Sequence, residues 1–101
     1  MDMNFKAKLE VNNVSVELNP FVHEFLTRTV VGAVSSLKGA EDIQGLELCL
    51  ERNEVRIILN GSELPLTPFP KEIINNTIIG LVSPLKGIDK VDNLKINIRP
   101  K

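Results

Sequence analysis

The residue types that most often carry out chemistry in proteins are sparse in this chain. It contains one histidine, His23, and one cysteine, Cys49. A general base needs a nucleophile or a carboxylate beside it, and no short motif places one next to His23. One histidine and one cysteine are also too few ligands for a zinc site. The sequence therefore predicts no catalytic residue, no metal site and no cofactor, and we interpret His23 as a solvated surface residue.

Cys49 occurs in a stretch where apolar and polar residues alternate, and it lies on the polar side of that alternation. Glu47 and Glu51 flank it on the same side. A reactive thiolate usually needs a cationic neighbour or a helix N-terminus, and carboxylates disfavour the anion. We therefore interpret Cys49 as an incidental thiol.

Two sets of small and basic residues are candidates for binding. The sets are Gly32, Ser36 and Lys38, and Gly80, Ser83 and Lys86. Glycine inside a helix costs roughly 0.5–1 kcal/mol relative to alanine, so we expect a compensating reason for it. One interpretation is a close approach of two helices to each other or to a sheet. The other is a groove between the helices that takes a small molecule or an anion, although the lysines also suit the negative end of a helix.

These candidates belong to a sequence repeat. Shifting the chain by 48 positions places Pro20-Phe21 on Pro68-Phe69 and Leu37-Lys38-Gly39 on Leu85-Lys86-Gly87. Repeat 1 covers about 4–52 and repeat 2 about 53–101. A repeat of this size is too short to hold a core alone, so we expect residues 1–101 to form a single domain.

The first repeat reads as strand, strand, helix, strand. Apolar and polar residues alternate from Phe5 to Val11, and again from Val14 to Leu18, with Asn12-Asn13 suited to the tight turn between them. Asn19-Pro20 is a helix start, since asparagine can cap free amides and proline suits the first turn. An apolar stripe at spacings of three and four then predicts a helix over Phe21 to Leu37. The alternation from Leu46 to Leu50 closes the unit.

The second repeat has the same order. We expect strands over 55–59, 64–66 and 94–98, with a hairpin turn at Asn60-Gly61. Thr67-Pro68 starts the second helix. Pro84 predicts that this helix kinks or ends near 81–83, because the proline ring would press on the carbonyl of Gly80. A change of inward parity between the repeats predicts a turn near 52–53.

The pattern as a whole predicts the α+β class. A duplicated β-β-α-β unit would form a six-stranded, mostly antiparallel sheet, with two helices packed on one face and an approximate two-fold axis. The other face would be wet, and the order of the strands stays open. Ile58 points outward on this reading, which indicates a covered sheet face or a partner.

Composition narrows the classes of partner. The formal net charge is −1, so a dedicated nucleic-acid binder is not expected. A single cysteine favours a reduced, cytoplasmic setting. No apolar stretch reaches about 18 residues, so we expect no membrane partner.

In the first repeat the duplicated segment runs from Asn19-Pro20-Phe21-Val22 to Leu37-Lys38-Gly39. The duplicated segment resembles a group of small uncharacterised prokaryotic proteins of archaeal or clostridial type. The resemblance implies a cytoplasmic protein and no catalytic residue. Our leading hypothesis is a non-enzymatic protein-interaction or structural module, which binds itself as a homodimer or binds another protein. The alternative is a small-molecule or anion binder that uses the groove between the helices.

Overall fold

The computed structural model describes residues 5–37, 42–52, 54–85 and 87–101. It contains two helices and six strands. In chain order they are β1 (Phe5–Val11), β2 (Val14–Val16), α1 (Pro20–Ser35), β3 (Leu46–Glu51), β4 (Glu54–Leu59), β5 (Ser62–Glu63), α2 (Pro68–Val82) and β6 (Asn93–Pro100).

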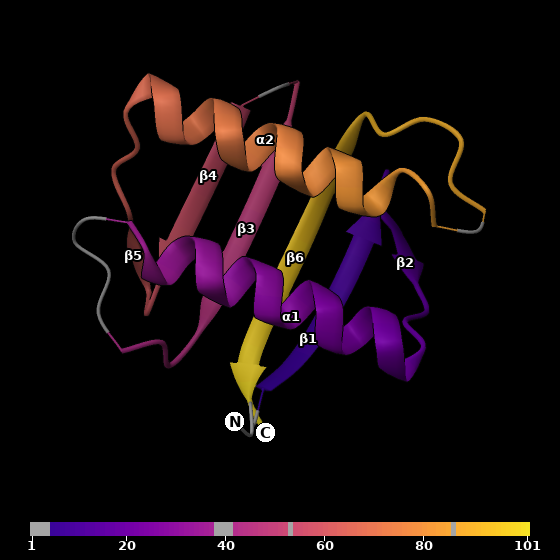
Figure 1. Cartoon of the computed structure of the whole chain (residues 1–101), viewed down its shortest axis with the longest axis horizontal. Coiled ribbons are helices and arrows are strands. Elements are labelled where there is room, and N and C mark those ends of the chain that lie inside the picture. The colour runs from indigo at the N-terminus through magenta and orange to yellow at the C-terminus, as the bar shows by residue number, and fades with distance from the viewer. Residues whose placement is uncertain (1–4, 38–41, 53, 86) are drawn as a thin grey trace.

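The strands form one antiparallel sheet in the order β2-β1-β6-β3-β4-β5. Both helices lie across the same face of this sheet and run in opposite directions, while the other face stays open (Figure 1). The α+β class and the six-stranded antiparallel sheet predicted from the sequence are therefore confirmed. The strands β4, β5 and β6 lie 48 positions along the chain from β1, β2 and β3. Exchanging each strand with its counterpart gives the same strand order, read from the other edge of the sheet.

The core lies between the sheet and the helices, and both halves of the chain contribute to it. Alternate residues of the strands point into it, such as Leu48, Ile57 and Ile96. Each helix packs mainly on the first strand of its own half, α1 on β1 and α2 on β4. The opposite alternation on every strand leaves the charged residues on the open face.

The two asparagines that follow β1 and β4 hold the halves together. Asn12 Oδ1 accepts hydrogen bonds from the backbone N–H groups of Asp92 (2.8 Å) and Asn93 (3.1 Å), and its Nδ2 donates to the Lys90 carbonyl (2.7 Å). Asn12, and likewise Asn60, binds the loop that leads into the final strand of the other half. These contacts hold β6 beside β1 and β3 beside β4.

Asn60 makes the equivalent contacts. It accepts from Gln44 N–H (2.7 Å) and Gly45 N–H (3.0 Å), and donates to the Asp42 carbonyl (2.7 Å).

The predicted turns are present at all three strand hairpins. Asn12, Asn13 and Asn60 have positive φ angles of 52°, 68° and 52°, and Gly61 has 85°, as tight hairpin turns require. The parity change is absorbed by a turn between β3 and β4, where Arg52 has a φ of 49°. Asn53 lies outside the described residues.

The strand predicted over 64–66 is wrong. The pairing of β4 with β5 ends at Ser62 and Glu63, although the Leu64 N–H still donates to the Ile57 carbonyl. Pro65 has no N–H with which to continue the ladder, so β5 is short and lies at the sheet edge.

The start of α1 agrees with the cap predicted from the sequence, whereas the start of α2 does not. Asn19 Oδ1 accepts a hydrogen bond from the Val22 N–H (2.8 Å), as predicted for a cap. Thr67 precedes α2 in the same position but makes no side-chain cap bond. The predicted early end of α2 is confirmed, since the helix stops at Val82, before Pro84.

Candidate functional site

The outer side of the helix pair is apolar, and the sequence did not predict this. Phe21 and Phe25 on α1 are 73% and 53% exposed, and Phe69 and Ile73 on α2 are 71% and 48% exposed. Three of the four phenylalanines of the chain are thus on the surface. We call these four residues the helix-pair surface. The sequence had included Phe21 and Phe25 in the broad apolar stripe of the first helix.

Helix geometry explains the exposure of these rings. Leu26, Val30 and Val34 are fully buried and define the side of α1 that faces the sheet. Thr27, which follows Leu26, is also buried, so the buried side of α1 extends in that direction. Phe25 points about 100° away on the other side of Leu26 and falls outside the buried side. The predicted apolar stripe was too wide for one contact face. A finer reading of helical angles would have found the two exposed rings.

An apolar cavity of about 290 Å³ opens beside Phe21 and Phe25. The start of α1 lines one wall, and the segment around the end of α2 lines the other, because the helices are antiparallel. The lining is Phe21, Val22, Phe25, Gly80, Leu81, Pro84 and Leu85. The rings of Phe21 and Phe25 lie 5.8 Å apart in a tilted arrangement that aromatic pairs favour. We call this space the interhelical cavity.

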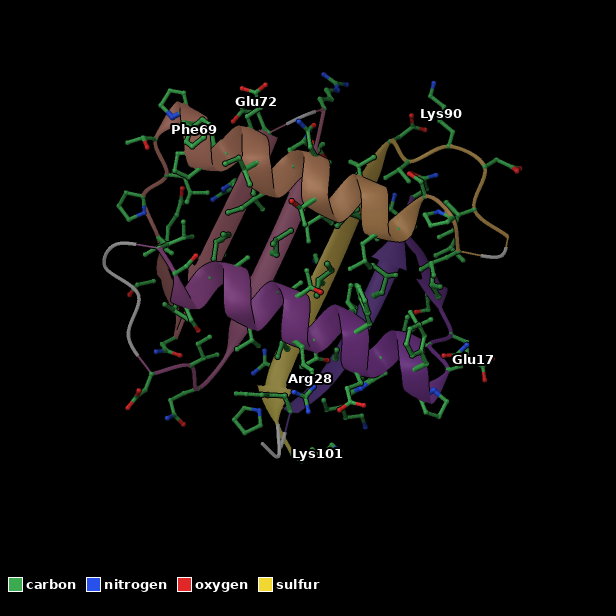
Figure 2. All side chains as sticks on the ribbon, in the orientation of Figure 1. Glu17, Arg28, Phe69, Glu72, Lys90 and Lys101 are labelled. Carbon is green, nitrogen blue, oxygen red and sulfur yellow. The ribbon has the colours of Figure 1, made fainter. Side chains whose placement is uncertain are left out.

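Charged side chains lie on the outer flanks of the helices. Figure 2 shows Arg28 on the side of α1 that faces away from α2, and Glu72 on the side of α2 that faces away from α1. Arg28 forms an exposed ion pair with Glu24 at 2.9 Å. The charges thus border the helix pair and leave the interhelical cavity apolar.

The binding residues predicted from the sequence do not converge on one site. Gly80 lines the interhelical cavity, but Gly32 lies seven residues beyond Phe25, about 10 Å further along α1. The Ser36 and Ser83 hydroxyls donate to helix carbonyls of Ala33 (2.7 Å) and Ile79 (2.6 Å). Those two hydroxyls therefore serve the helix ends. Lys38 and Lys86 lie outside the described residues.

The two helix glycines are not required by close packing. A Cβ atom added at Gly32 or Gly80 would have no neighbouring atom within 4 Å. The interpretation of a close approach between the helices is therefore wrong. What glycine does at position 80 is leave the rim of the interhelical cavity open.

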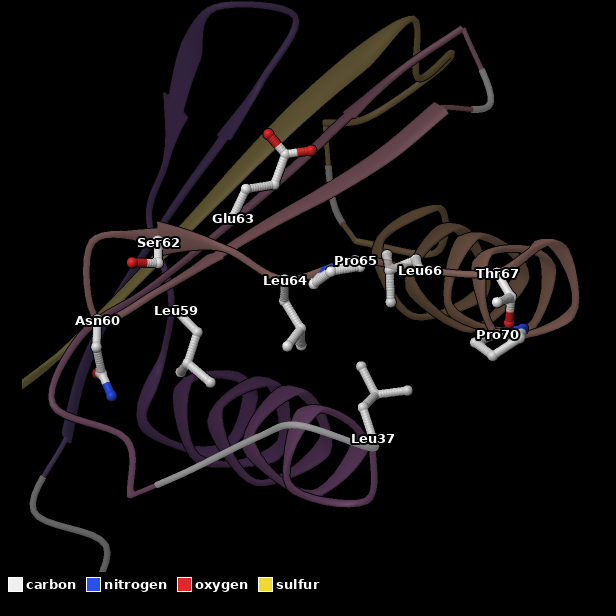
Figure 3. Close-up of a pocket in the computed structure, with 10 residues that line it drawn as sticks. All are labelled: Leu37, Leu59, Asn60, Ser62, Glu63, Leu64, Pro65, Leu66, Thr67 and Pro70. Carbon is white, nitrogen blue, oxygen red and sulfur yellow. The ribbon is translucent and has the colours of Figure 1, made fainter.

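A larger cavity, of about 700 Å³, lies at the sheet edge (Figure 3). Leu59 and Leu64 point into it from the sheet side, Leu37 points into it from the end of α1, and Glu63 points away from it. The polar groups of this cavity do not converge on a common point, and we assign it no chemistry.

His23 is a structural contact, which corrects its interpretation as a solvated residue. Its Nε2 atom accepts a hydrogen bond from the Ala7 N–H at 2.9 Å. β2 pairs only with Leu9 to Val11, so the Ala7 N–H faces an uncovered stretch of the β1 edge. His23 is half-buried and satisfies this edge amide from α1. Sequence alone gave no signal for a contact across the sheet edge.

The surroundings of Cys49 disfavour its thiolate, as its carboxylate neighbours led us to expect. Burial raises the pKa of its thiol above the usual value, and the hydrogen bond to Glu47 (3.5 Å) together with the charge of that carboxylate raises the pKa further. Lys95 and Arg56 act in the opposite direction but do not prevail. The thiol form is favoured, which does not suit a nucleophile.

The described residues contain neither a metal-binding cluster nor a membrane-spanning helix. Within 5–37, 42–52, 54–85 and 87–101, no group of three His, Cys, Asp or Glu side chains could hold a metal ion. Over the same residues, neither helix has the length and apolar character needed to cross a membrane.

Comparisons with protein families, with curated proteins and with solved structures give no match for this chain. The resemblance noted from the sequence therefore stays a prediction. Function has to be argued from the surfaces of the molecule, of which the helix-pair surface is the most distinctive.

Proposed function

We propose that this protein is a non-enzymatic protein-interaction module that binds another protein through its helix-pair surface. The observation that carries the proposal is the exposure of Phe21 and Phe25 beside the interhelical cavity; Phe69 and Ile73 are exposed at the other end of the helix pair, because the helices are antiparallel (Figure 1). Neighbouring large apolar side chains on a surface commonly mark interaction sites, and aromatic residues are frequent at interfaces. The cytoplasmic location expected from the single cysteine belongs to the same proposal.

The interhelical cavity indicates a protein partner that inserts apolar side chains. Its volume of about 290 Å³ is at the lower end of ordinary ligand pockets, and its lining is apolar. A cavity of that size suits one or two apolar side chains projecting from a partner segment. Phe21 and Phe25 at its rim would cover those side chains and exclude water around them. The partner is therefore a peptide segment with leucine or aromatic anchors.

Gly80 strengthens this assignment. Glycine is unfavourable inside a helix, and no packing contact at position 80 compensates for it. Any larger side chain there would project at the mouth of the interhelical cavity. Access to the cavity is thus a reason for glycine that folding does not supply.

Selection from a random peptide library displayed on phage tests the proposal. We expect enrichment of peptides with leucine or aromatic anchors that bind the wild-type protein. Their affinity should fall at least about tenfold for Phe21→Ser/Phe25→Ser, because truncating buried aromatic anchors commonly costs 1.4 kcal/mol or more, roughly a factor of ten. Gly80→Leu should have the same effect by blocking the cavity.

Val14→Ser is the matched control. Val14 is 65% exposed but lies on β2, away from the helix-pair surface. Peptides that bind all variants equally, or a selection that enriches none, would contradict the proposal. Circular dichroism of each variant establishes that the fold is retained.

A small-molecule binder is the second candidate, and the apolar lining of the interhelical cavity favours it. Such a ligand would be apolar and compact, such as indole or toluene. Ligand-observed NMR with these two probes should show binding that Gly80→Leu abolishes. No binding at millimolar probe would remove this candidate and leave the protein-interaction proposal intact. The anion part of the idea rests on Lys38 and Lys86 alone.

A further inference from the structure

Two like-charged pairs face each other across strands on the open face of the sheet. Lys6 on β1 lies directly opposite Arg99 on β6, and Glu51 on β3 lies directly opposite Glu54 on β4. Like charges in directly opposed positions destabilise a sheet. We call Lys6 and Arg99 the basic pair, and Glu51 and Glu54 the acidic pair.

The two pairs occupy opposite ends of the open face. The basic pair lies where β1 begins and β6 ends, beside the C-terminus, whereas the acidic pair flanks the turn between β3 and β4 at the other end of the sheet (Figure 1). They are also counterparts in the sequence repeat, since Lys6 and Glu54, and Glu51 and Arg99, are each 48 positions apart. Equivalent corners of the face thus carry opposite charge.

The remaining charges on the open face follow the same division. Among the described residues, β1 and β6 carry four basic side chains and one acidic one on this face, while β3, β4 and β5 carry three acidic ones and one basic. The first group is Lys6, Lys8, Lys95 and Arg99 with Glu10, and the second is Glu47, Glu51 and Glu63 with Arg56. One half of the face is therefore positive and the other negative.

Contacts within the monomer neutralise only part of this separation. Arg56 reaches Glu63 at 3.1 Å, and Lys95 approaches Glu47 at 3.8 Å. Glu54 has an open-face position in the strand alternation, but its carboxylate pairs at 3.0 Å with Lys71 of α2, on the helix side of the sheet. Glu51 is therefore the member of the acidic pair that faces the open side. Within the described part of the chain, no ion pair is present for Lys6 or Glu51. These two residues, one from each pair, are the most direct sites for an opposite charge from outside.

We propose that the open face binds a second copy of this chain, with the basic pair of each copy against the acidic pair of the other. A two-fold axis makes the contact reciprocal, because placing one basic pair on one acidic pair also brings the other two together. The charge distribution is complementary to itself, which selects a second copy over an unrelated partner. The half-buried Ile58 and Cys49 lie between the two ends and would become covered.

The face is large enough for such a dimer. The two long extents of the molecule, 35 and 32 Å, lie in the plane of the sheet, as Figure 1 shows. A standard interface covers roughly 800 Å² per partner, which this face can supply. Because the contacts are mainly between exposed charges, association should be modest in affinity and should weaken as salt is added.

Charge-swapped variants test the proposal. Lys6→Glu/Arg99→Glu makes both corners acidic, and Glu51→Arg/Glu54→Lys makes both corners basic. Each variant alone should self-associate about 100-fold or more weakly than the wild type, since like charges brought together in an interface are strongly repelled. An equimolar mixture of the two should associate again, because both contacts between unlike variants are attractive. Analytical ultracentrifugation at low salt measures all three samples.

Glu24→Lys/Arg28→Glu is the control, since it exchanges an ion pair on the flank of α1 and leaves the open face unchanged. It should dimerise as the wild type does. A wild type that is monomeric up to millimolar concentration at low salt would overturn the proposal. So would a mixture of variants that stays monomeric, or variants that dimerise like the wild type.

One further measurement does not depend on the folding of any variant. Amide NMR shifts of the wild-type protein should change with concentration on the open-face strands, at residues such as Lys95 and Asn97, and not on the outer side of α1. Changes confined to α1 and α2 would overturn the proposal. Phe21→Ser/Phe25→Ser should leave dimerisation intact, so the helix-pair proposal and the dimer proposal can fail independently.

Discussion

The two halves of the chain, residues 5–51 and 54–100, agree where they hold the fold and differ where they meet solvent. Asn12 and Asn60 make matching contacts to the loop of the other half. At the helix starts, by contrast, His23 bonds to a backbone amide of β1, while its counterpart Lys71 forms an ion pair with Glu54. The comparison teaches that shared residues mark the scaffold, and that specific function belongs to positions where the halves diverge.

Removing the side-chain contacts of Asn12 or Asn60 should give the largest loss of stability, and the loss should be equal in the two halves. Asn12→Gly and Asn60→Gly keep the positive φ angle but each removes three side-chain hydrogen bonds. We expect each to lower the free energy of unfolding by about 1–3 kcal/mol. Urea denaturation of the two variants measures this, and a loss in only one of them would break the equivalence of the halves.

Substitutions at the starts of the two helices should lower the stability by unequal amounts. His23→Ala leaves the Ala7 N–H without its acceptor, so we expect a loss of about 1–2 kcal/mol. Lys71→Ala removes an exposed ion pair with Glu54 and should cost well under about 1 kcal/mol. Thermal and urea unfolding give both values. Equal losses would show that the His23 contact adds nothing beyond an ordinary surface contact.

The helix glycines should respond equally, and in the stabilising direction. A Cβ at Gly32 or at Gly80 has open space around it. Gly32→Ala and Gly80→Ala should therefore each raise the free energy of unfolding by about 0.5–1 kcal/mol. Destabilisation of either variant in a denaturant series would mean that glycine is needed for folding at that position. Access to the interhelical cavity would then no longer explain Gly80.

The smallest expected effect concerns the rate at which the Cys49 thiol is alkylated. Since burial and Glu47 raise the pKa of the thiol, a smaller fraction is thiolate at pH 8 than in free cysteine. Alkylation by iodoacetamide should accordingly be slower than for free cysteine, and should accelerate only at higher pH. Glu47→Gln removes a negative charge, lowers the pKa and should speed the reaction, whereas Glu51→Gln serves as the control. A wild-type rate equal to that of free cysteine would contradict this reasoning.

Local patterns predicted the elements well because each depends on residues close in sequence. Alternation placed the strands, Asn60-Gly61 placed a hairpin, and Pro84 placed the end of α2. Apart from the strand predicted over 64–66, which Pro65 prevents, the errors came from contacts between distant segments. The Ala7 N–H required an acceptor only because β2 is too short to cover it, and no local pattern shows which side chain of α1 will reach it.

The candidate sites were harder to predict for the same reason. Periodicity marked Phe21 and Phe25 as apolar, but only the packing of Leu26 and Val30 against the sheet decided that those rings point outward. Among the groove residues predicted from the sequence, Gly32 and Gly80 are counterparts in the repeat. The antiparallel run of the helices then placed Gly32 and Gly80 away from each other.

By itself the sequence determined the α+β class, the six-stranded sheet and the turn positions, because alternation, helical spacing and backbone preferences act over a few residues. Only the tertiary structure decided the strand order, the exposed aromatic side of the helices and the division of charge on the open face. Those features depend on which distant segments lie side by side. The pairing of β1 with β6 and of β3 with β4 turns scattered lysines, arginines and glutamates into two opposed corners.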